Sequence, residues 1–266
     1  MHVTRWGNAG PKVILVHGSA QGSSVGGDRH FPVQQRLAER GWQLLVPDRP
    51  GHGLSPDPGR PDDAEADGAL VAELLKEAGT EGAHLVGHSF GGCVALVAAA
   101  MNPAAVRSLT IIEPAMAALA ISKPVVLGFV FRIVNVLLLS RSDESRIERF
   151  VKLANIPAEI RGGSNPAELK RMGQAIKRLK LPSKATLAHQ LETVKHAGIP
   201  LLVVSGGWSP AFEAVSDTVA AVGRGRRLVI ASEHHFPQQV SDEFNQRLAL
   251  FMQESDAARA RARAAR

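Results

Sequence analysis

The chain has 266 residues, of which 45% are hydrophobic, and its formal net charge is +6 at pH 7. This length is at the upper edge of a single domain and is enough to bury a large core. One cysteine, Cys93, excludes an internal disulfide framework, and residues 1–6 lack the apolar segment of a secretory signal peptide. We therefore expect a soluble globular protein of the cytoplasm.

The positive charge is concentrated in two segments. Residues 115–195 hold fourteen Lys and Arg against six Asp and Glu, and residues 255–266 hold four arginines against Asp256. The rest of the chain therefore carries a net negative charge. A basic Ala/Arg tail is usually solvated or a frayed helix end, so we expect 255–266 to be a basic flexible tail and expect no nucleic-acid partner.

Short apolar runs alternate with helical stretches along most of the chain. The expected strands are 13–16, 43–47, a run that ends at Val86, 109–112, 200–205 and 228–231. The expected helices are 32–39, 62–78, 93–100, 211–221 and 242–253. Continuous apolar strands separated by helices predict a parallel sheet that is covered on both faces. Active sites in such sheets lie at the carboxyl ends of the strands.

One strand-to-helix junction carries a candidate nucleophile. Gly87 and Gly91 stand two residues before and two after Ser89, between the strand that ends at Val86 and a helix that begins near Cys93. Such a sharp turn requires small flanking residues, and it would lift the Ser89 hydroxyl above the sheet in a strained conformation. The N-terminus of the helix would favour developing negative charge. We interpret Cys93 as a small core residue rather than a nucleophile.

These motifs together resemble the α/β-hydrolase family along nearly the whole chain. The matching features are a His-Gly turn at 17–18, a D-x-P-G-H-G-x-S loop at 48–55, the G-H-S-F-G-G junction at 87–92 and a late histidine. The resemblance implies an α/β-hydrolase fold, with a mostly parallel, doubly wound sheet and an inserted helical cap. The implied domains are a core of 1–114 and 196–254 and a cap of 115–195. The implied chemistry is a Ser–His–acid triad that needs no cofactor.

The family pattern also selects the base. Residues His234 and His235 follow the last expected strand, where the family places its catalytic histidine, and His235-Phe236-Pro237-Gln238 matches a common family pattern. We expect His235 to be the base, with His234 as the alternative in register. The family motifs favour structural roles for His17 and His52, and we expect the His88 side chain to point away from the serine.

The acid departs from the common pattern. Most family members carry an aspartate shortly after the strand that corresponds to 201–205, but Ser209 stands at that position here. A minority takes the acid from the end of the preceding strand, where this chain has Glu113, twenty-four residues beyond Ser89. That distance suits one helix, one turn and one returning strand. We therefore predict that Glu113 accepts a hydrogen bond from His235 Nδ1, and regard Glu213 and Asp217 as poorer candidates because they belong to an expected helix.

The remaining site assignments follow the family pattern more loosely. The oxyanion donors are expected to be the backbone N–H groups of Phe90 and Ser19. We interpret Asp48 as a residue that orients its loop. Neither a phosphate-binding Gly-rich motif with its lysine nor a ligand cluster for a metal is present in the sequence, so we expect no cofactor and no metal.

The cap segment contains two patterned stretches. Residues 124–139 are very apolar but too short to span a bilayer, and we expect one face to line an apolar substrate pocket, with Phe129, Phe131 and Trp208 as tentative pocket residues. A second stripe, residues Leu169, Met172, Ile176 and Leu179, is surrounded by lysines and arginines. It is typical of a lid helix over its core, with a docking surface for a membrane or an acidic partner as the alternative. The pair Gly162-Gly163 is a candidate hinge.

The predicted function is a cofactor-free serine hydrolase that cleaves an ester, lactone or related acyl bond of a hydrophobic small molecule. Perhydrolysis and C–C bond hydrolysis are alternatives on the same fold. A non-catalytic ligand-binding scaffold is a further alternative, favoured modestly by the missing aspartate. The sequence leaves the oligomeric state open.

Overall fold

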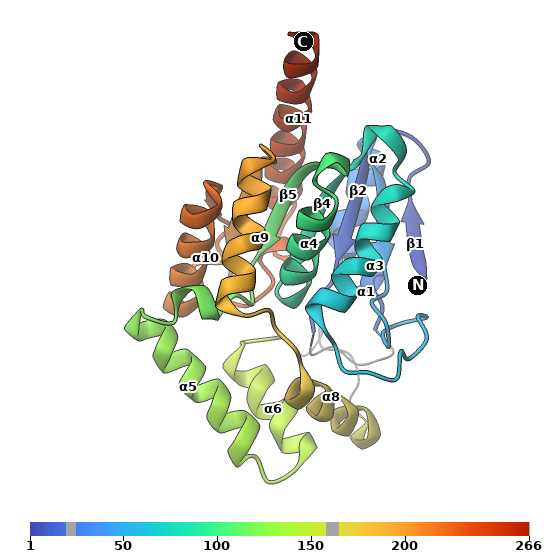
Figure 1. Cartoon of the computed structure of the whole chain (residues 1–266). Helices are drawn as coiled ribbons and strands as arrows, with labels where there is room; N and C mark the ends of the chain where they lie inside the picture. The colour runs from blue at the N-terminus through green and yellow to red at the C-terminus, as the bar shows by residue number, and fades with distance from the viewer. Residues whose placement is uncertain (20–24, 158–164, 266) are drawn as a thin grey trace.

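Parallel strands organise the computed structural model, which describes residues 1–19, 25–157 and 165–265. Within these residues, one seven-stranded sheet has the order β1-β3-β2-β4-β5-β6-β7 (Figure 1). Its strands are β1 Val3–Trp6, β2 Lys12–Val16, β3 Gln43–Pro47, β4 Ala83–His88, β5 Val106–Ile112, β6 Leu201–Ser205 and β7 Arg226–Val229. The neighbouring strands of this sheet pair in parallel, except that β1 pairs antiparallel with β3. The predicted fold class is confirmed.

Helices cover both faces of the sheet because alternate strand residues point to opposite sides. Within β2, residues Ile14 and Val16 pack with one core cluster, and Val13 and Leu15 pack with another. The first cluster lies under α3 Ala64–Lys76, α4 Phe90–Met101, α9 Lys184–His196 and α10 Pro210–Gly223. The second lies under α2 Arg36–Glu39 and α11 Glu243–Ala264. Short segments complete the layers: α1 Gly27–His30 and the 3₁₀ turns Pro32–Gln35, Gly79–Glu81, Pro103–Ala105 and Pro237–Gln239.

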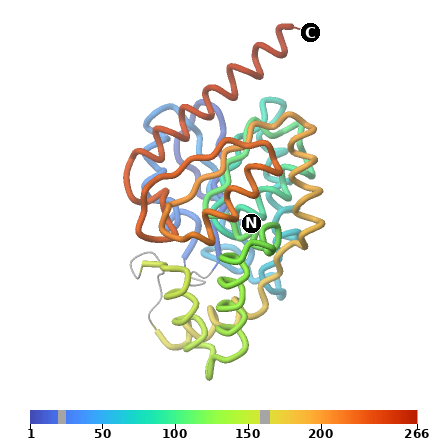
Figure 2. Tube along the Cα trace, turned by 90° about the vertical axis from the view of Figure 1, so that its left-hand side faces the viewer, coloured from blue at the N-terminus to red at the C-terminus, as the bar shows by residue number. Residues whose placement is uncertain are grey.

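Three helices form a separate lobe below the carboxyl edge of the sheet (Figures 1 and 2). They are α5 Pro124–Leu139, α6 Asp143–Leu153 and α8 Pro166–Arg178, and they follow the 3₁₀ turn Ala117–Ala120. We call these three helices the cap. A small cluster that includes Ile147, Met172 and Ile176 holds α6 against α8. In contrast, α9 lies inside the range predicted for the cap but packs on α4 and α10.

The structure differs from the expected elements at both ends of the chain. The strand β1 was not predicted, and β7 begins at Arg226 instead of Leu228. Where a basic flexible tail was expected, residues 255–264 continue α11 as a regular helix that projects beyond the sheet (Figure 1). Alanine and arginine are both strong helix formers. Ion pairs from Asp256 to Arg107 and from Arg263 to Glu81 join this helix to the core.

Candidate active site

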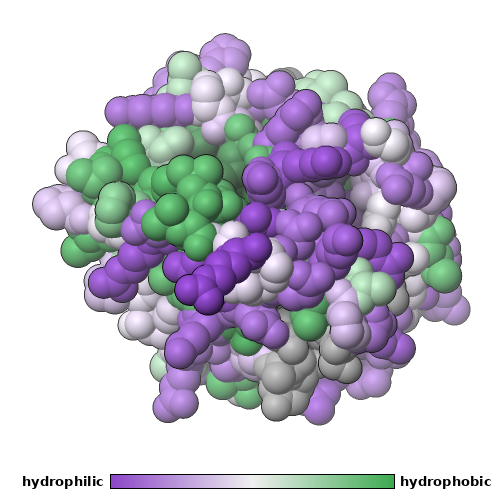
Figure 3. Space-filling model, turned by 90° about the horizontal axis from the view of Figure 1, so that it is seen from below, coloured by the Kyte–Doolittle hydropathy of each residue, from purple (hydrophilic) through white to green (hydrophobic). Residues whose placement is uncertain are grey.

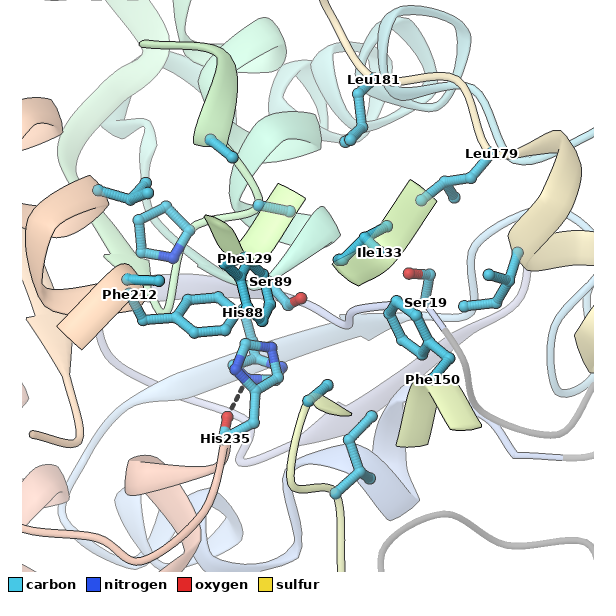
Figure 4. Close-up of a pocket in the computed structure, with 18 of the residues that line it drawn as sticks. Ser19, His88, Ser89, Phe129, Ile133, Phe150, Leu179, Leu181, Phe212 and His235 are labelled. Atoms are coloured by element: carbon cyan, nitrogen blue, oxygen red, sulfur yellow. Dashed lines mark hydrogen bonds between the residues drawn. The ribbon is translucent and has the colours of Figure 1, made fainter. Parts of the chain in front are cut away.

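Ser89 occupies a strained turn between β4 and α4. Its φ is +55° and ψ is −118°, a backbone conformation that is costly for a residue with a side chain. A Cβ at Gly87 would lie 2.2 Å from the carbonyl oxygen of Gly91, and one at Gly91 would lie 2.3 Å from the carbonyl oxygen of Val16. Only glycine fits at these two positions. The turn leaves Ser89 partly exposed at the wall of a pocket (Figure 4).

Glu113 follows β5, the strand that is hydrogen-bonded to β4. Its side chain is fully buried, and its φ of +47° turns the chain sharply away from the sheet. Oε1 accepts a hydrogen bond from the backbone N–H of Gly206 at 2.6 Å, and Oε2 accepts one from Trp208 Nε1 at 3.2 Å. Oε2 also lies 3.0 Å from His235 Nδ1. The structure therefore brings the predicted acid and the predicted base into direct contact.

His235 stands on the loop after β7, and both of its backbone polar groups are held. Its N–H donates to the carbonyl oxygen of Asn155, at the end of α6, over 3.3 Å. Its carbonyl oxygen accepts a hydrogen bond from His88 Nε2 at 2.7 Å, drawn as a dashed line in Figure 4. The alternative base, His234, is bound to Ser232 and to the backbone N–H of Phe236. The backbone contacts and the bond to Glu113 favour His235 over His234 for the reactive position.

A chain of buried histidines fixes the tautomers beside the site. Because a carbonyl oxygen can only accept, His88 Nε2 carries a proton and its Nδ1 is free to accept. His30 Nε2 donates to His88 Nδ1 over 2.8 Å. Burial lowers the pKa of both His30 and His88 well below the ordinary value, so both rings are neutral near pH 7. His88 lines the same pocket as Ser89, but its side chain makes no hydrogen bond with Ser89 within the described residues.

Burial also governs the charge of the contact between Glu113 and His235. It raises the pKa of the Glu113 carboxyl to about 8, against the opposing effect of the Gly206 and Trp208 donors. It lowers the pKa of His235 to about 3. Both shifts have the same cause, since a low-dielectric site disfavours charge on either group. The pair shares one hydrogen bond, so its protonation is a property of the pair.

The competing residues are engaged elsewhere. Glu213 and Asp217 both form ion pairs with Arg227 on β7. Cys93 is buried in the core, and burial raises the pKa of its thiol to about 12, which suits a core residue. Asp48 accepts hydrogen bonds from the backbone N–H groups of Gly27 and Leu54, as expected of a residue that orients its loop.

The turn after β2 brings Ser19 to the pocket wall. Buried Arg49 donates to the carbonyl oxygens of His17 and Gly18, over 3.2 and 2.9 Å respectively. In a trans peptide the N–H points opposite to the C=O. The N–H of Ser19 therefore points away from Arg49. A Cβ at Gly18 would lie 3.2 Å from the Ser89 Cβ, so this turn and the turn at Ser89 are adjacent.

The pocket is apolar and lies between the sheet edge and the cap. Its volume is about 180 Å³, and α5 contributes Phe129, Ile133 and Leu137. The other lining residues are Ser19, His88, Ser89, Pro114, Ala115, Ala117, Phe150, Ala154, Ile156, Ile176, Leu179, Leu181, Ala211, Phe212, Val215, His235 and Phe236. Phe129 stacks edge-on against Phe212, whose ring lies 4.6 Å from that of His235.

Two of the three tentative pocket residues do not line this pocket. Phe131 is 64% exposed, because a step of two residues along a helix turns the side chain about 200° away from Phe129. Trp208 is not among the lining residues, since its indole N–H is directed at Glu113. The candidate hinge Gly162-Gly163 lies outside the described residues. Within the lid stripe, Met172 and Ile176 are buried, as a lid helix over its core requires.

Sequence reasoning missed two contributors to the site, Arg49 and His30, and it did not predict the role of Trp208 as a donor to Glu113. A buried arginine and an indole donor leave no spacing signal, and His30 contacts His88 from a distant part of the chain. Within the described residues, no group of three or more His, Cys, Asp or Glu side chains is arranged to hold a metal ion.

Comparisons with known proteins agree with this architecture. A family model for the α/β hydrolase fold matches residues 11–155. Lipase LipV of Mycobacterium tuberculosis is 36% identical over 120 residues, which are 44% of this chain and 42% of that relative. The matched region thus spans less than half of that curated relative's length.

Solved structures match over nearly the whole chain. MenH from S. aureus has a TM-score of 0.70 at 18% identity, with 96% of this chain and 99% of that chain covered. Est816, described as an N-acyl homoserine lactone degrading enzyme, has a TM-score of 0.63 at 22% identity, with 94% and 96% covered. At these identities the structural matches report on the fold.

Proposed function

Because this chain belongs to the α/β-hydrolase family, we propose that it is a cofactor-free serine hydrolase that uses Ser89, His235 and Glu113. The observation that carries the proposal is the 3.0 Å contact between Glu113 Oε2 and His235 Nδ1 at the wall of the pocket that Ser89 also lines. The expected substrate is an ester, lactone or related acyl compound of a small hydrophobic molecule.

The reaction follows from the roles of the three side chains. His235 Nε2 takes the hydroxyl proton of Ser89 as Oγ attacks the carbonyl carbon, and Glu113 stabilises the imidazolium that forms. Collapse of the tetrahedral intermediate expels the leaving alkoxide, which receives the proton from His235. Water, deprotonated by His235, then attacks the acyl-enzyme. The second tetrahedral intermediate releases the acid as Ser89 Oγ leaves and takes the proton back from His235. Ser89 Oγ and His235 are not hydrogen-bonded within the described residues, and such contacts often tighten only when substrate binds.

Two backbone N–H groups are suited to the oxyanion. The N–H of Phe90 belongs to the first turn of α4, where helix N–H groups have no partner inside the helix. The N–H of Ser19 points away from Arg49, and Ser19 lines the same pocket as Ser89. Both donors are backbone groups on turns that neighbouring carbonyl contacts hold in place, which is the preorganisation that oxyanion stabilisation needs.

The pocket supports an apolar acyl or ring group as the bound part of the substrate. Its volume of about 180 Å³ is close to the ~150 Å³ of a cavity that holds one benzene ring. Carbon atoms of aromatic and aliphatic side chains form most of its wall. The similarity to a lipase supports acyl-bond chemistry.

A fluorophosphonate probe tests the nucleophile directly. The wild-type protein should become labelled and should hydrolyse p-nitrophenyl esters, whereas Ser89→Ala should lose both properties while its circular dichroism spectrum stays unchanged. The loss of turnover should reach several orders of magnitude. Ser209→Ala is the matched control and should retain both. A folded wild-type protein that stays unlabelled and inactive would favour the non-catalytic binding scaffold instead.

A further inference from the structure

The cap helix α5 is apolar on two opposite faces. Its inner face, which includes Phe129 and Ile133, lines the pocket. Its outer face consists of Leu127, Phe131, Val134 and Leu138, at steps of four, three and four residues. Such steps place side chains in one row along a helix.

The outer face of α5 is open to solvent. Its members are exposed by 55% at Leu127, 64% at Phe131, 40% at Val134 and 71% at Leu138. Single exposed apolar residues are common on protein surfaces, but a contiguous row of them marks an interaction site. Figure 3, which views the cap from below, shows a hydrophobic patch on the side where α5 lies, directly beside strongly hydrophilic side chains.

Cations accompany this apolar row. Arg132 follows Phe131, and Arg141 follows the end of α5; both are exposed, and neither has an ion-pair partner among the residues that the structure describes. Helix α8 adds exposed Lys170, Arg171 and Lys177 to the same lobe. Residues 115–195, which include the cap, carry fourteen basic against six acidic side chains, so this segment is strongly positive.

We propose that the outer face of α5 docks on a lipid surface that contains anionic headgroups, with the helix lying in the plane of the interface. An apolar row flanked by cations is the pattern of helices that lie at the boundary between headgroups and acyl chains. Docking along the surface also suits the length of α5, which has 16 residues. Within the described residues, no helix is long and apolar enough to cross a membrane.

Charge and shape favour lipid over two other occupants. A second copy would bring two strongly positive caps together, and that repulsion opposes association. The outer face of α5 is one side of a single helix, so an acidic protein could cover it only with a complementary groove of its own. A lipid surface adapts to a convex row and gains from the same positive charge.

Vesicle binding tests this proposal with a matched pair of variants. The wild-type protein should co-sediment with phosphatidylcholine vesicles that contain phosphatidylglycerol. The double variant Phe131→Ser/Leu138→Ser removes two apolar side chains from the outer face of α5. Its affinity for these vesicles should fall by at least about tenfold. The control Leu54→Ser/Leu250→Ser removes two leucines that are exposed by 76% and 50% elsewhere, and should bind like the wild type.

A second comparison tests the charge. Binding should weaken for Arg132→Gln/Arg141→Gln, in high salt, and on vesicles of phosphatidylcholine alone. Ser89→Ala should bind as the wild type does, because docking does not depend on the proposed hydrolase reaction. Absence of vesicle binding, or equal binding by the two serine double variants, would overturn the proposal. So would a dimer in light scattering that Phe131→Ser/Leu138→Ser dissociates, since a second copy would then cover this face.

Discussion

The two walls of the pocket are built in different ways. The sheet edge holds Ser89, Glu113 and His235 on short turns that follow strands, and hydrogen bonds to neighbouring backbone groups fix each of them. The opposite wall is a set of three helices around a small cluster, and it touches the histidine loop through Asn155. Backbone-fixed groups are suited to positioning reacting atoms, whereas packed apolar side chains are suited to selecting a substrate by size. Changes at the sheet edge should therefore reduce kcat, and changes in the cap should alter selectivity.

The largest effect after loss of the nucleophile is expected at Glu113. Glu113→Gln keeps the shape of the side chain but removes the charge that stabilises the imidazolium, so kcat should fall by about 10³–10⁴-fold. Steady-state kinetics on a p-nitrophenyl ester would measure it. Glu213→Gln is the matched control, and its rate should be nearly unaltered because Glu213 pairs with Arg227. If Glu213→Gln lowered kcat strongly and Glu113→Gln did not, the acid would be Glu213 on α10.

The pH dependence should report on the same pair. In the proposed mechanism the active form has neutral His235 beside ionised Glu113, and burial disfavours that net negative charge. Activity should therefore be low when the pair holds its extra proton, and kcat/KM should rise with pH through an apparent pKa above the ordinary histidine value of about 6.5.

Glu113→Gln supplies the control for this pH profile. The pair then becomes cationic when protonated, and burial disfavours that form. The acid limb of the residual activity should therefore move below about pH 6.5. An acid limb at the same pH in both proteins would show that Glu113 and His235 do not titrate together.

A smaller effect, confined to selectivity, is expected in the cap. Phe129→Ala opens the pocket wall beside Phe212, so kcat/KM for a medium-chain p-nitrophenyl ester should fall by about tenfold relative to the acetate. Phe131→Ala, two residues further along the same helix, should leave this ratio unchanged because the side chain is exposed. Equal effects of the two substitutions would show that the change in selectivity comes from destabilisation of α5 and not from the loss of a side chain that lines the pocket.

The elements that the sequence predicted well are those with strong local signals. The alternation of apolar runs with helices predicted the sheet, and the glycines at 87 and 91 predicted the strained turn at Ser89. The length of chain between Ser89 and Glu113 placed the carboxylate at the neighbouring strand end, where the structure has it. The sheet and the turn follow from hydrophobic patterning and sterics, which a sequence contains, whereas the choice of Glu113 also rested on the resemblance to the α/β-hydrolase family.

The features that escaped prediction depend on partners distant in sequence. The strand β1 is short and half-exposed, and it exists through its pairing with β3. The strand β7 begins with two arginines, one of which pairs with Glu213 and Asp217 on α10. The role of Trp208 as a donor to Glu113 could not be read from the sequence either, because an indole beside a turn is compatible with a pocket wall or a hydrogen bond.

The positive φ angles at Ser89 and Glu113 have a consequence for the stability of the fold. Each such residue stores about 1–3 kcal/mol of strain that the rest of the structure must offset. Glycine would adopt the same backbone without that penalty. Ser89→Gly should therefore unfold at a higher temperature than the wild type even though it lacks the hydroxyl. Ser89 is thus a position where selection for thermal stability alone would favour loss of the proposed nucleophile.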